Sequence, residues 1–343
     1  MPLVSLGRHP GLLWAWACLA GPAEFGQAVV ASLRHRDLEL VSMRSSWNSG
    51  GYYHWEWHRV WSRLRGKGPE YADRLARGPD APGWDDREAT LLRAVDELHD
   101  DLGVSTPTLA ALRDHFDERQ LIEICFVAGH YELLAMALGS IDAPFDGWRR
   151  ARDPDVGPLP RRRRLPSTSR PLPSSASVEP AGPSSLPLRA WFPASPTAMA
   201  VLASQTHLRR LLLGFARRSS RFATLDAGDH HLAVLRTLSN SGAGDECAHQ
   251  VSMAGAGALD NDDIEEIMQG PDAPGCSPRQ ATLLRAVDEL DVDYFISDET
   301  WRHLARFLDA RQLIELGFLV GHHRTFAMML NTLAPSTAPG RSM

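Results

Sequence analysis

A block of sequence occurs twice in this 343-residue chain, and the second copy follows the first at a constant spacing of 192 residues, as between Ala89 and Ala281. The shared stretches are ATLLRAVDEL from Ala89 and Ala281, GPDAPG from Gly78 and Gly270, and RQLIE from Arg119 and Arg311. No insertion disturbs this register between Asn48 and Ala135 of the first copy. We therefore expect two copies of one domain, so each position can be compared with its counterpart.

Composition divides the chain into three parts. Residues 1–150 hold the first copy and residues 191–343 hold the second, divergent copy. Between them, residues 151–190 are rich in Pro, Ser and Arg and contain too few apolar residues to bury a core, so we predict a disordered linker. Its arginine run, Arg161–Arg164, is either solvated or contacts an anionic partner. Over the whole chain 43% of residues are apolar, which is enough for a core in each copy.

Charge and cysteine usage limit the classes of function. A net charge of -6 argues against a nucleic-acid partner, because binding to phosphates needs a basic surface. No apolar run reaches the roughly 18 residues of a membrane span, so no membrane partner is expected. The apolar stretch from Gly11 to Ala23 fits either an amphipathic helix or a signal-peptide core. The cysteines form no CxxC motif, which favours a reducing cytoplasm over a disulfide framework. They are Cys18, Cys125, Cys247 and Cys276.

Helix-start signals recur in both copies. An acceptor at the N-cap is followed three residues later by Glu or Gln, which predicts a capping box. These pairs are Asp85 with Glu88, Ser277 with Gln280, Asp117 with Gln120, and Asp309 with Gln312. A shorter helix is expected to open at Thr106 in the first copy and at Ser297 in the second. Alternating β-branched runs and Asn-Gly hairpin signals are absent, so we predict an all-α fold of two tandem helical domains.

The helix expected from Asp117 to about Gly139 is apolar around much of its circumference and should be central to the domain. His130 and its counterpart His322 interrupt the apolar face. Each is either a core histidine with a satisfied hydrogen bond or a residue that lines a pocket.

One group of polar residues has the composition of an acid–base site. His54 and His58 are four residues apart on the helix expected from Tyr52, so they share a face. An antiparallel neighbouring helix could bring Glu39 close to both imidazoles. A carboxylate partner fixes the tautomer of an imidazole and raises its pKa, which suits proton transfer near neutral pH.

The same residues have two further interpretations. Two histidines at this spacing with a carboxylate could bind zinc or iron, but the spacing is common on helices and we predict neither a metal nor a cofactor. Tyr52 and Trp55 belong to an aromatic cluster on the same helix. Such clusters usually pack in cores, although these two rings are candidates for a pocket wall.

The order Glu39, Gly51, His54, His58, followed by GPDAPGWDDREATLLRAVDEL and DERQLIEICFVAGHYELLAMAL, resembles the carboxymuconolactone decarboxylase superfamily, which includes the alkylhydroperoxidase D proteins. The resemblance covers most of both copies, roughly residues 5–145 and 195–335. It implies an all-helical fold that assembles into trimers or hexamers, with the pocket among helices near the subunit interface. Activities in the family include decarboxylation of a lactone acid and thiol-dependent peroxide reduction.

The peroxidase members of that family carry a CxxC motif whose two positions correspond here to Gly51 and His54. Peroxide reduction through a disulfide needs both thiols, so a thiol peroxidase is not expected. Glu39 and His58 match the acidic and histidine positions of the family. His54 and Trp55 stand where related non-thiol members often show Glu-Trp.

The second copy differs at these positions. The counterparts of Glu39, Gly51, His54, Trp55 and His58 are His231, Ala243, Glu246, Cys247 and Gln250, with His249 just before the last. His231 and Glu246 interchange carboxylate and imidazole, so either a mirrored pair survives or the site is lost. Cys247 is either a lone nucleophile or an inert thiol.

The leading hypothesis is a carboxymuconolactone-decarboxylase-like protein whose first copy acts on a small carboxylate, lactone or other carbon acid. His58 would transfer the proton, Glu39 would orient His58, and His54 would assist as a second base or stabilise developing negative charge. The alternative is a catalytically idle helical module for binding or assembly. In either case we predict that the two copies pair within the chain and that the protein forms homo-oligomers.

Overall fold

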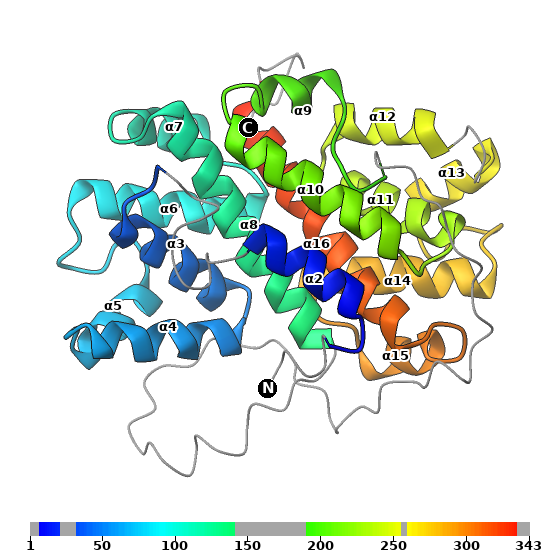
Figure 1. The fold of residues 1–343 in the computed structure, drawn as a ribbon, viewed down its shortest axis with the longest axis horizontal. Coiled ribbons are helices and arrows are strands. Elements are labelled where there is room, and N and C mark those ends of the chain that lie inside the picture. Colours follow the sequence, from blue (N-terminus) through cyan, green and yellow to red (C-terminus); the bar gives the residue numbers. More distant parts are fainter. Residues whose placement is uncertain (1–6, 21–31, 141–189, 255–258, 335–343) are drawn as a thin grey trace, which may run out of the picture.

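The computed structural model describes residues 7–20, 32–140, 190–254 and 259–334. Within these ranges the regular secondary structure is helical throughout, which confirms the all-α prediction (Figure 1). The predicted linker at 151–190 lies outside the described residues except for Ala190.

The two repeats fold into matching series of helices. Those of the first repeat are α3 (His35–Asn48), α4 (Tyr52–Leu64), α5 (Pro69–Arg77), α6 (Asp86–Asp101), α7 (Thr106–Arg113) and α8 (Glu118–Ser140). Those of the second repeat are α11 (Ala227–Asn240), α12 (Gly244–Ala254), α13 (Asn261–Gln269), α14 (Pro278–Asp293), α15 (Asp298–Leu304) and α16 (Ala310–Leu333). The bounds of α3, α5 and α6 recur 192 residues later in α11, α13 and α14, so the sequence register is also a structural register.

The expected caps account for most of the helix starts. Capping boxes form at Asp85, Ser277 and Asp309, and Asp117 exchanges the same pair of hydrogen bonds with Gln120. The N-cap of α7 is Ser105, one residue before the predicted Thr106. Its hydroxyl accepts from the Thr108 amide, and it corresponds in the repeat to Ser297, the predicted and observed N-cap of α15.

In each repeat one arginine joins the helix that precedes the GPDAPG loop to an aspartate of the helix that follows it, and this arginine is buried in the first repeat and half-buried in the second. Arg44 donates to Asp96 at 2.5 Å and to the Leu75 carbonyl at 2.9 Å. Arg236 repeats both contacts, to Asp288 at 2.7 Å and to Ile267 at 3.2 Å. The first glycine of the loop has a φ of 92° at Gly78 and 106° at Gly270, and a Cβ there would lie 2.8 Å from the guanidinium. Glycine is therefore required at that position in both copies.

The long helices α8 and α16 lie side by side at the centre of the molecule (Figure 1). Gly129 faces Thr325 while Gly321 faces Leu133, so the helices are antiparallel and related by an approximate two-fold axis. A Cβ on Gly321 would lie 2.6 Å from the Leu133 Cα, which shows how closely the backbones approach. Among the described helices, Glu118–Gly139 alone is long and apolar enough to cross a bilayer, and that segment is wholly buried in the protein.

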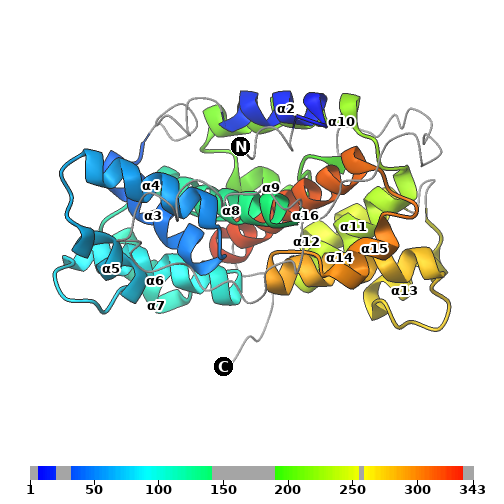
Figure 2. The same cartoon turned by 90° about the horizontal axis from the view of Figure 1, so that it is seen from below.

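Two further helices, α2 (Pro10–Ala20) and α10 (Thr206–Phe222), form an outer layer over the central pair, opposite α6 and α14 (Figure 2). Trp16 of α2 packs against Phe318 of α16, with ring centroids 6.5 Å apart. Gln205, the N-cap of α10, donates to the Arg119 carbonyl of α8 at 2.8 Å. Each repeat's early helix thus contacts the other repeat's long helix. The described part of the apolar stretch, residues 11–20, is a packed helix.

Candidate functional site

The two histidines of α4 lie beside Tyr131 of α8. His58 Nε2 is 2.8 Å from the Tyr131 hydroxyl, and the His54 ring stands edge-on to the Tyr131 ring at 5.5 Å between centroids. The spacing of four residues puts both imidazoles on the helix face that packs toward α8. His54 is buried, whereas His58 is half-buried and its ring is reached by solvent.

The expected contact between Glu39 and the histidines is not formed. Ser62, one helical turn beyond His58, donates to Glu39 Oε1 at 2.7 Å, and Lys67 pairs with Glu39 Oε2. The crossing of α3 and α4 therefore directs the carboxylate to the last turn of α4. Burial by itself would raise the pKa of Glu39, but the hydrogen bonds from Lys67 and Ser62 outweigh it and lower that pKa.

The aromatic residues proposed as pocket walls mostly belong to the core. Trp55 is fully buried against Trp47, with ring centroids 4.9 Å apart, whereas Tyr52 at the start of α4 is half-buried. The His130 ring stacks parallel to Trp16 on one side and lies near Phe126 at 5.8 Å. Trp55 is therefore a core residue, and the His130 ring packs among other aromatic rings.

The mirrored pair of the second repeat does not form either. His231 Nδ1 donates to the Ala227 carbonyl in the preceding turn of α11, at 2.7 Å. Glu246 instead accepts from the Ser195 amide at 3.1 Å and from Gln250 at 3.0 Å. His249, half-buried on α12, precedes Gln250.

The chain segment that leads into α9 (Pro196–Val201) fills the site of the second repeat. His230 and His323 both donate to the Ala190 carbonyl, at 3.2 and 3.1 Å, and His322 donates to the Trp191 carbonyl at 2.8 Å. The Trp191 side chain is completely buried. His322 is therefore a core histidine with a satisfied hydrogen bond, and burial lowers its pKa to about 3.

Three of the four cysteines lie in environments that disfavour a thiolate. All four lie in the described residues, and none forms a disulfide. Burial raises the pKa of Cys125 to about 12, and burial also raises the pKa of Cys247 and of Cys276. A thiol peroxidase needs a thiolate near neutral pH, which these environments disfavour.

The described residues contain no group of three or more His, Cys, Asp or Glu side chains arranged to hold a metal ion. His54, His58 and Glu39, the set that could have served as ligands, diverge as described above.

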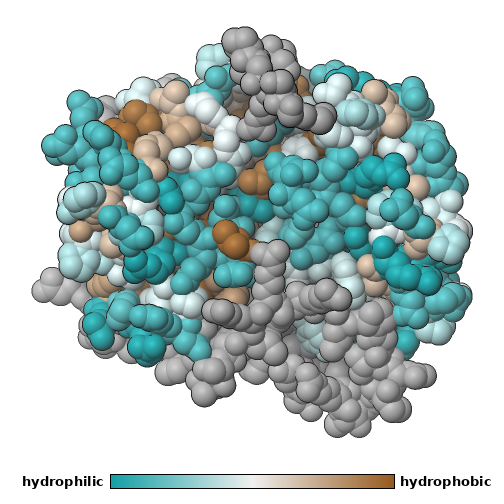
Figure 3. Space-filling view, turned by 180° about the vertical axis from the view of Figure 1, so that it is seen from behind, coloured by the Kyte–Doolittle hydropathy of each residue, from teal (hydrophilic) through white to brown (hydrophobic). Residues whose placement is uncertain are grey.

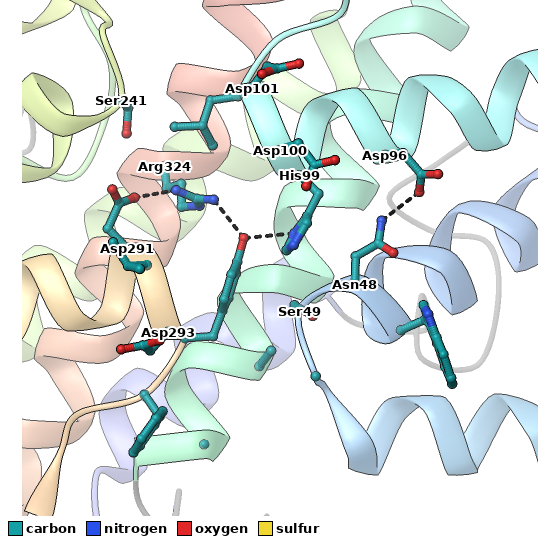
Figure 4. Close-up of a pocket in the computed structure, with 18 of the residues that line it drawn as sticks. Asn48, Ser49, Asp96, His99, Asp100, Asp101, Ser241, Asp291, Asp293 and Arg324 are labelled. Carbon is teal, nitrogen blue, oxygen red and sulfur yellow. Dashed lines mark hydrogen bonds and ion pairs between the residues drawn. The ribbon is translucent and has the colours of Figure 1, made fainter. Parts of the chain in front are cut away.

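A cleft of about 1060 Å³ lies between the two repeats, away from these histidines, and the sequence reasoning missed it. His99 at the end of α6 and Arg324 of α16 reach toward one another across it (Figure 4). The Tyr294 hydroxyl joins them, 3.0 Å from His99 Nδ1 and 2.7 Å from Arg324 Nη2. Glu132 of α8 lies beneath, 2.8 Å from His99 Nδ1 and 3.0 Å from the Tyr294 hydroxyl. The remainder of the surface that carries α6 and α14 is largely hydrophilic (Figure 3).

This cluster has reversed charge across the approximate two-fold axis. His99 and Glu132 form one pair, and their counterparts Asp291 and Arg324 form the other. Glu132 and Arg324 also pair with one another, at 3.3 Å. The signal in the sequence was that Glu132 of one copy corresponds to Arg324 of the other, in the central part of the long helix.

The comparisons with known proteins give no family assignment. No protein-family model, no curated protein and no solved structure matches the chain. The fold and the site together describe an all-helical protein with an internal sequence duplication, and the resemblance to carboxymuconolactone decarboxylases rests on the motifs quoted above.

Proposed function

We propose that the protein is a carboxymuconolactone-decarboxylase-like catalyst with two tandem helical domains, whose first repeat carries a non-thiol acid–base site. The site acts on a small carboxylate, lactone or other carbon acid. His58 transfers the proton, and Tyr131 orients the imidazole of His58. The His54 ring packs against the ring of Tyr131. Tyr131 takes the orienting role that the motifs would assign to Glu39.

The observation that carries this proposal is the short contact between His58 Nε2 and the Tyr131 hydroxyl, at 2.8 Å, on a half-buried histidine. An imidazole near solvent with a fixed hydrogen-bond partner keeps one tautomer and can still exchange its proton. A phenol is also able to stabilise negative charge that develops on a substrate oxygen.

The contrast between repeats supports placing the chemistry in the first one. In the second repeat, Gln250 replaces His58 and bonds to Glu246, while His323 replaces Tyr131 and donates to the Ala190 carbonyl. A substrate would have to displace the chain's own backbone to reach that site. The second repeat then serves to complete the fold around α8 and α16.

Solvent-deuterium exchange tests this proposal without knowledge of the natural substrate. The protein is incubated in heavy water with a panel of small carboxylates, lactones and ketones, and loss of C–H signals is followed by proton NMR. We expect exchange of at least one compound with the wild type and a loss of about a hundredfold or more in His58→Gln, which reproduces the second repeat. Tyr131→Phe should reduce the exchange rate less, because it removes the hydrogen-bond partner of His58 and leaves His58 itself as the base.

His115→Gln is the matched control, since His115 is a partly exposed histidine of the same repeat and pairs with Asp86 at 3.1 Å. It should exchange at the wild-type rate, and circular dichroism should show intact helices in all three variants. Equal exchange by wild type and His58→Gln would refute the assignment of the base.

A second candidate function is a binding module without catalysis. The cleft between the repeats favours it, because the cleft is large and its floor is a rigid network of His99, Tyr294 and Arg324. This candidate predicts no exchange of any compound, together with ligand-induced stabilisation that Tyr294→Phe weakens and His58→Gln leaves unchanged.

A further inference from the structure

The chain contains a single lysine. Of its 36 lysine and arginine residues, only Lys67 is lysine, and it lies between Gly66 and Gly68 in the loop that joins α4 to α5. Its Nζ pairs with Glu39 and stands 4.1 Å from the centroid of the Tyr71 ring. The Lys67 side chain is 26% exposed, so a small molecule can reach it from solvent.

The partner of this lysine is a buried carboxylate held in a fixed orientation. Glu39 is 5% exposed, and the Ser62 hydroxyl donates to its Oε1, which leaves Oε2 directed at Lys67. Arg36 lies 3.9 Å from Oε2 and stacks over the Tyr71 ring at 4.8 Å. The amine and the carboxylate are thus positioned next to one another at the edge of the protein.

The second repeat shows that the fold does not need this group. Lys67 and five residues close to it in the first repeat are all replaced in the second. Arg36, Glu39, Ser62, Lys67, Tyr71 and Trp84 correspond to Gly228, His231, Ala254, Leu259, Asp263 and Cys276. By contrast, the Arg44–Asp96 pair of the scaffold returns as Arg236–Asp288. The group around Lys67 is therefore a feature of the first repeat alone.

We propose that Lys67 is a nucleophilic amine that forms an imine with the carbonyl carbon of a small oxo acid, with Glu39 as its proton acceptor and donor. This site goes beyond the acid–base function proposed above, because it uses neither His58 nor Tyr131. Arg36 and the exposed Arg65 supply positive charge near the amine, which favours a carbonyl compound that carries a carboxylate.

Each step conserves atoms and charge. The ammonium group of Lys67 passes one proton to the Glu39 carboxylate, and the neutral amine attacks the carbonyl carbon, so a C–N bond forms as the carbonyl π bond breaks. A second proton moves from nitrogen to oxygen and gives a carbinolamine. Glu39 returns its proton to the hydroxyl, which leaves as water while the nitrogen lone pair closes the C=N bond of a protonated imine. No oxidant or reductant takes part.

The surroundings also favour the neutral amine. Burial lowers the pKa of Lys67, and the positive charges of Arg36 and Arg65 act in the same direction, while Glu39 opposes them. The net effect is a pKa below that of an ordinary lysine, which increases the fraction of free amine at neutral pH.

Reductive trapping tests this site directly. The full-length protein is treated with glyoxylate and cyanoborohydride at neutral pH, and the secondary amine at Lys67 is quantified by peptide mass spectrometry. We expect folded protein to be labelled about a hundredfold faster than the urea-unfolded chain, as a positioned acid–base partner provides. Labelling at the same rate in both states would mean that Lys67 is only an ion-pair residue and would overturn the proposal.

Variants separate the parts of the proposal. Glu39→Gln should remove most of the rate enhancement. Ser62→Ala, which removes the hydrogen bond that orients Glu39 and reproduces Ala254 of the second repeat, should reduce the enhancement in a chain whose helical signal is intact. Wild-type rates in both would overturn the role of Glu39. Acetaldehyde, which lacks a carboxylate, should label more slowly than glyoxylate, and equal rates would overturn the oxo-acid class. Lys67 in the His58→Gln variant should be labelled at the wild-type rate. A failure of the Lys67 proposal can therefore be told apart from a failure of the acid–base proposal.

Discussion

The contact between α8 and α16 predicts the effect of a single methyl group. A Cβ on Gly321 would lie 2.6 Å from Cα and 2.8 Å from Cβ of Leu133, so Gly321→Ala forces the two backbones apart. Gly129→Ala meets the Thr325 side chain at 2.7 Å and its Cα at 2.8 Å. The steric cost of such overpacking is about 2–3 kcal/mol, and the better helix propensity of alanine offsets about 1 kcal/mol. We expect Gly321→Ala to lower the free energy of unfolding by about 1–2 kcal/mol.

Gly244→Ala is the matched control for this experiment. Gly244 opens α12, and a Cβ there would meet nothing within 4 Å. This variant should be as stable as the wild type or more stable by up to about 1 kcal/mol. Urea unfolding followed by circular dichroism gives the free energies. If Gly321→Ala is as stable as Gly244→Ala, the close approach of the two long helices at this point is wrong.

Two further predictions concern buried charges. Glu132→Gln should lower the free energy of unfolding in urea by about 3 kcal/mol, because it leaves the buried Arg324 and the half-buried His99 without their shared carboxylate. An unchanged midpoint would contradict the network. Burial lowers the pKa of His322 to about 3 and that of His323 to about 4, against 6.5 in the unfolded chain. The unfolded state therefore binds more protons below pH 6.5, so stability should fall as the pH decreases from 6.5 toward 4. His323→Gln should flatten this dependence in thermal unfolding, and an equally steep dependence in wild type and variant would contradict it.

Local features of the fold could be predicted because their causes are local. The capping boxes at Asp85, Ser277 and Asp309 depend on residues three positions apart, and the break after Asn48 depends on the two glycines that follow Ser49. The helices of the two repeats could be matched from the sequence because equivalent residues carry the same local signals. The N-cap of α7 was misplaced by one residue because Ser105 and Thr106 offer the same hydroxyl chemistry.

The geometry of the sites could be predicted only in part. The shared face of His54 and His58 follows from helix periodicity, but the direction of Glu39 depends on how α3 crosses α4, which no spacing encodes. Tyr131 was missed as the partner of His58 because it comes from a helix 73 residues away in sequence. The filling of the second site by Ala190 and Trp191 was missed because backbone carbonyls leave no signature in side-chain motifs.

The network at the inter-repeat cleft illustrates a signal that was present but unused. Glu132 and Arg324 occupy equivalent positions in two central helices, with opposite charge. Two like charges at these positions would repel one another inside the protein, whereas Glu132 and Arg324 attract one another. Comparing the repeats for exchanged charge, as well as for lost motif residues, would have identified this contact.

The central claim is that the first repeat keeps an accessible histidine site while the second repeat's site is filled by the chain itself. Diethyl pyrocarbonate acylates accessible neutral imidazoles, and peptide mass spectrometry reports each histidine separately. We predict modification of His58 in the native protein, with His230, His322 and His323 modified only after unfolding. Native modification of His322 and His323 at the rate of His58, or protection of His58, would contradict the account.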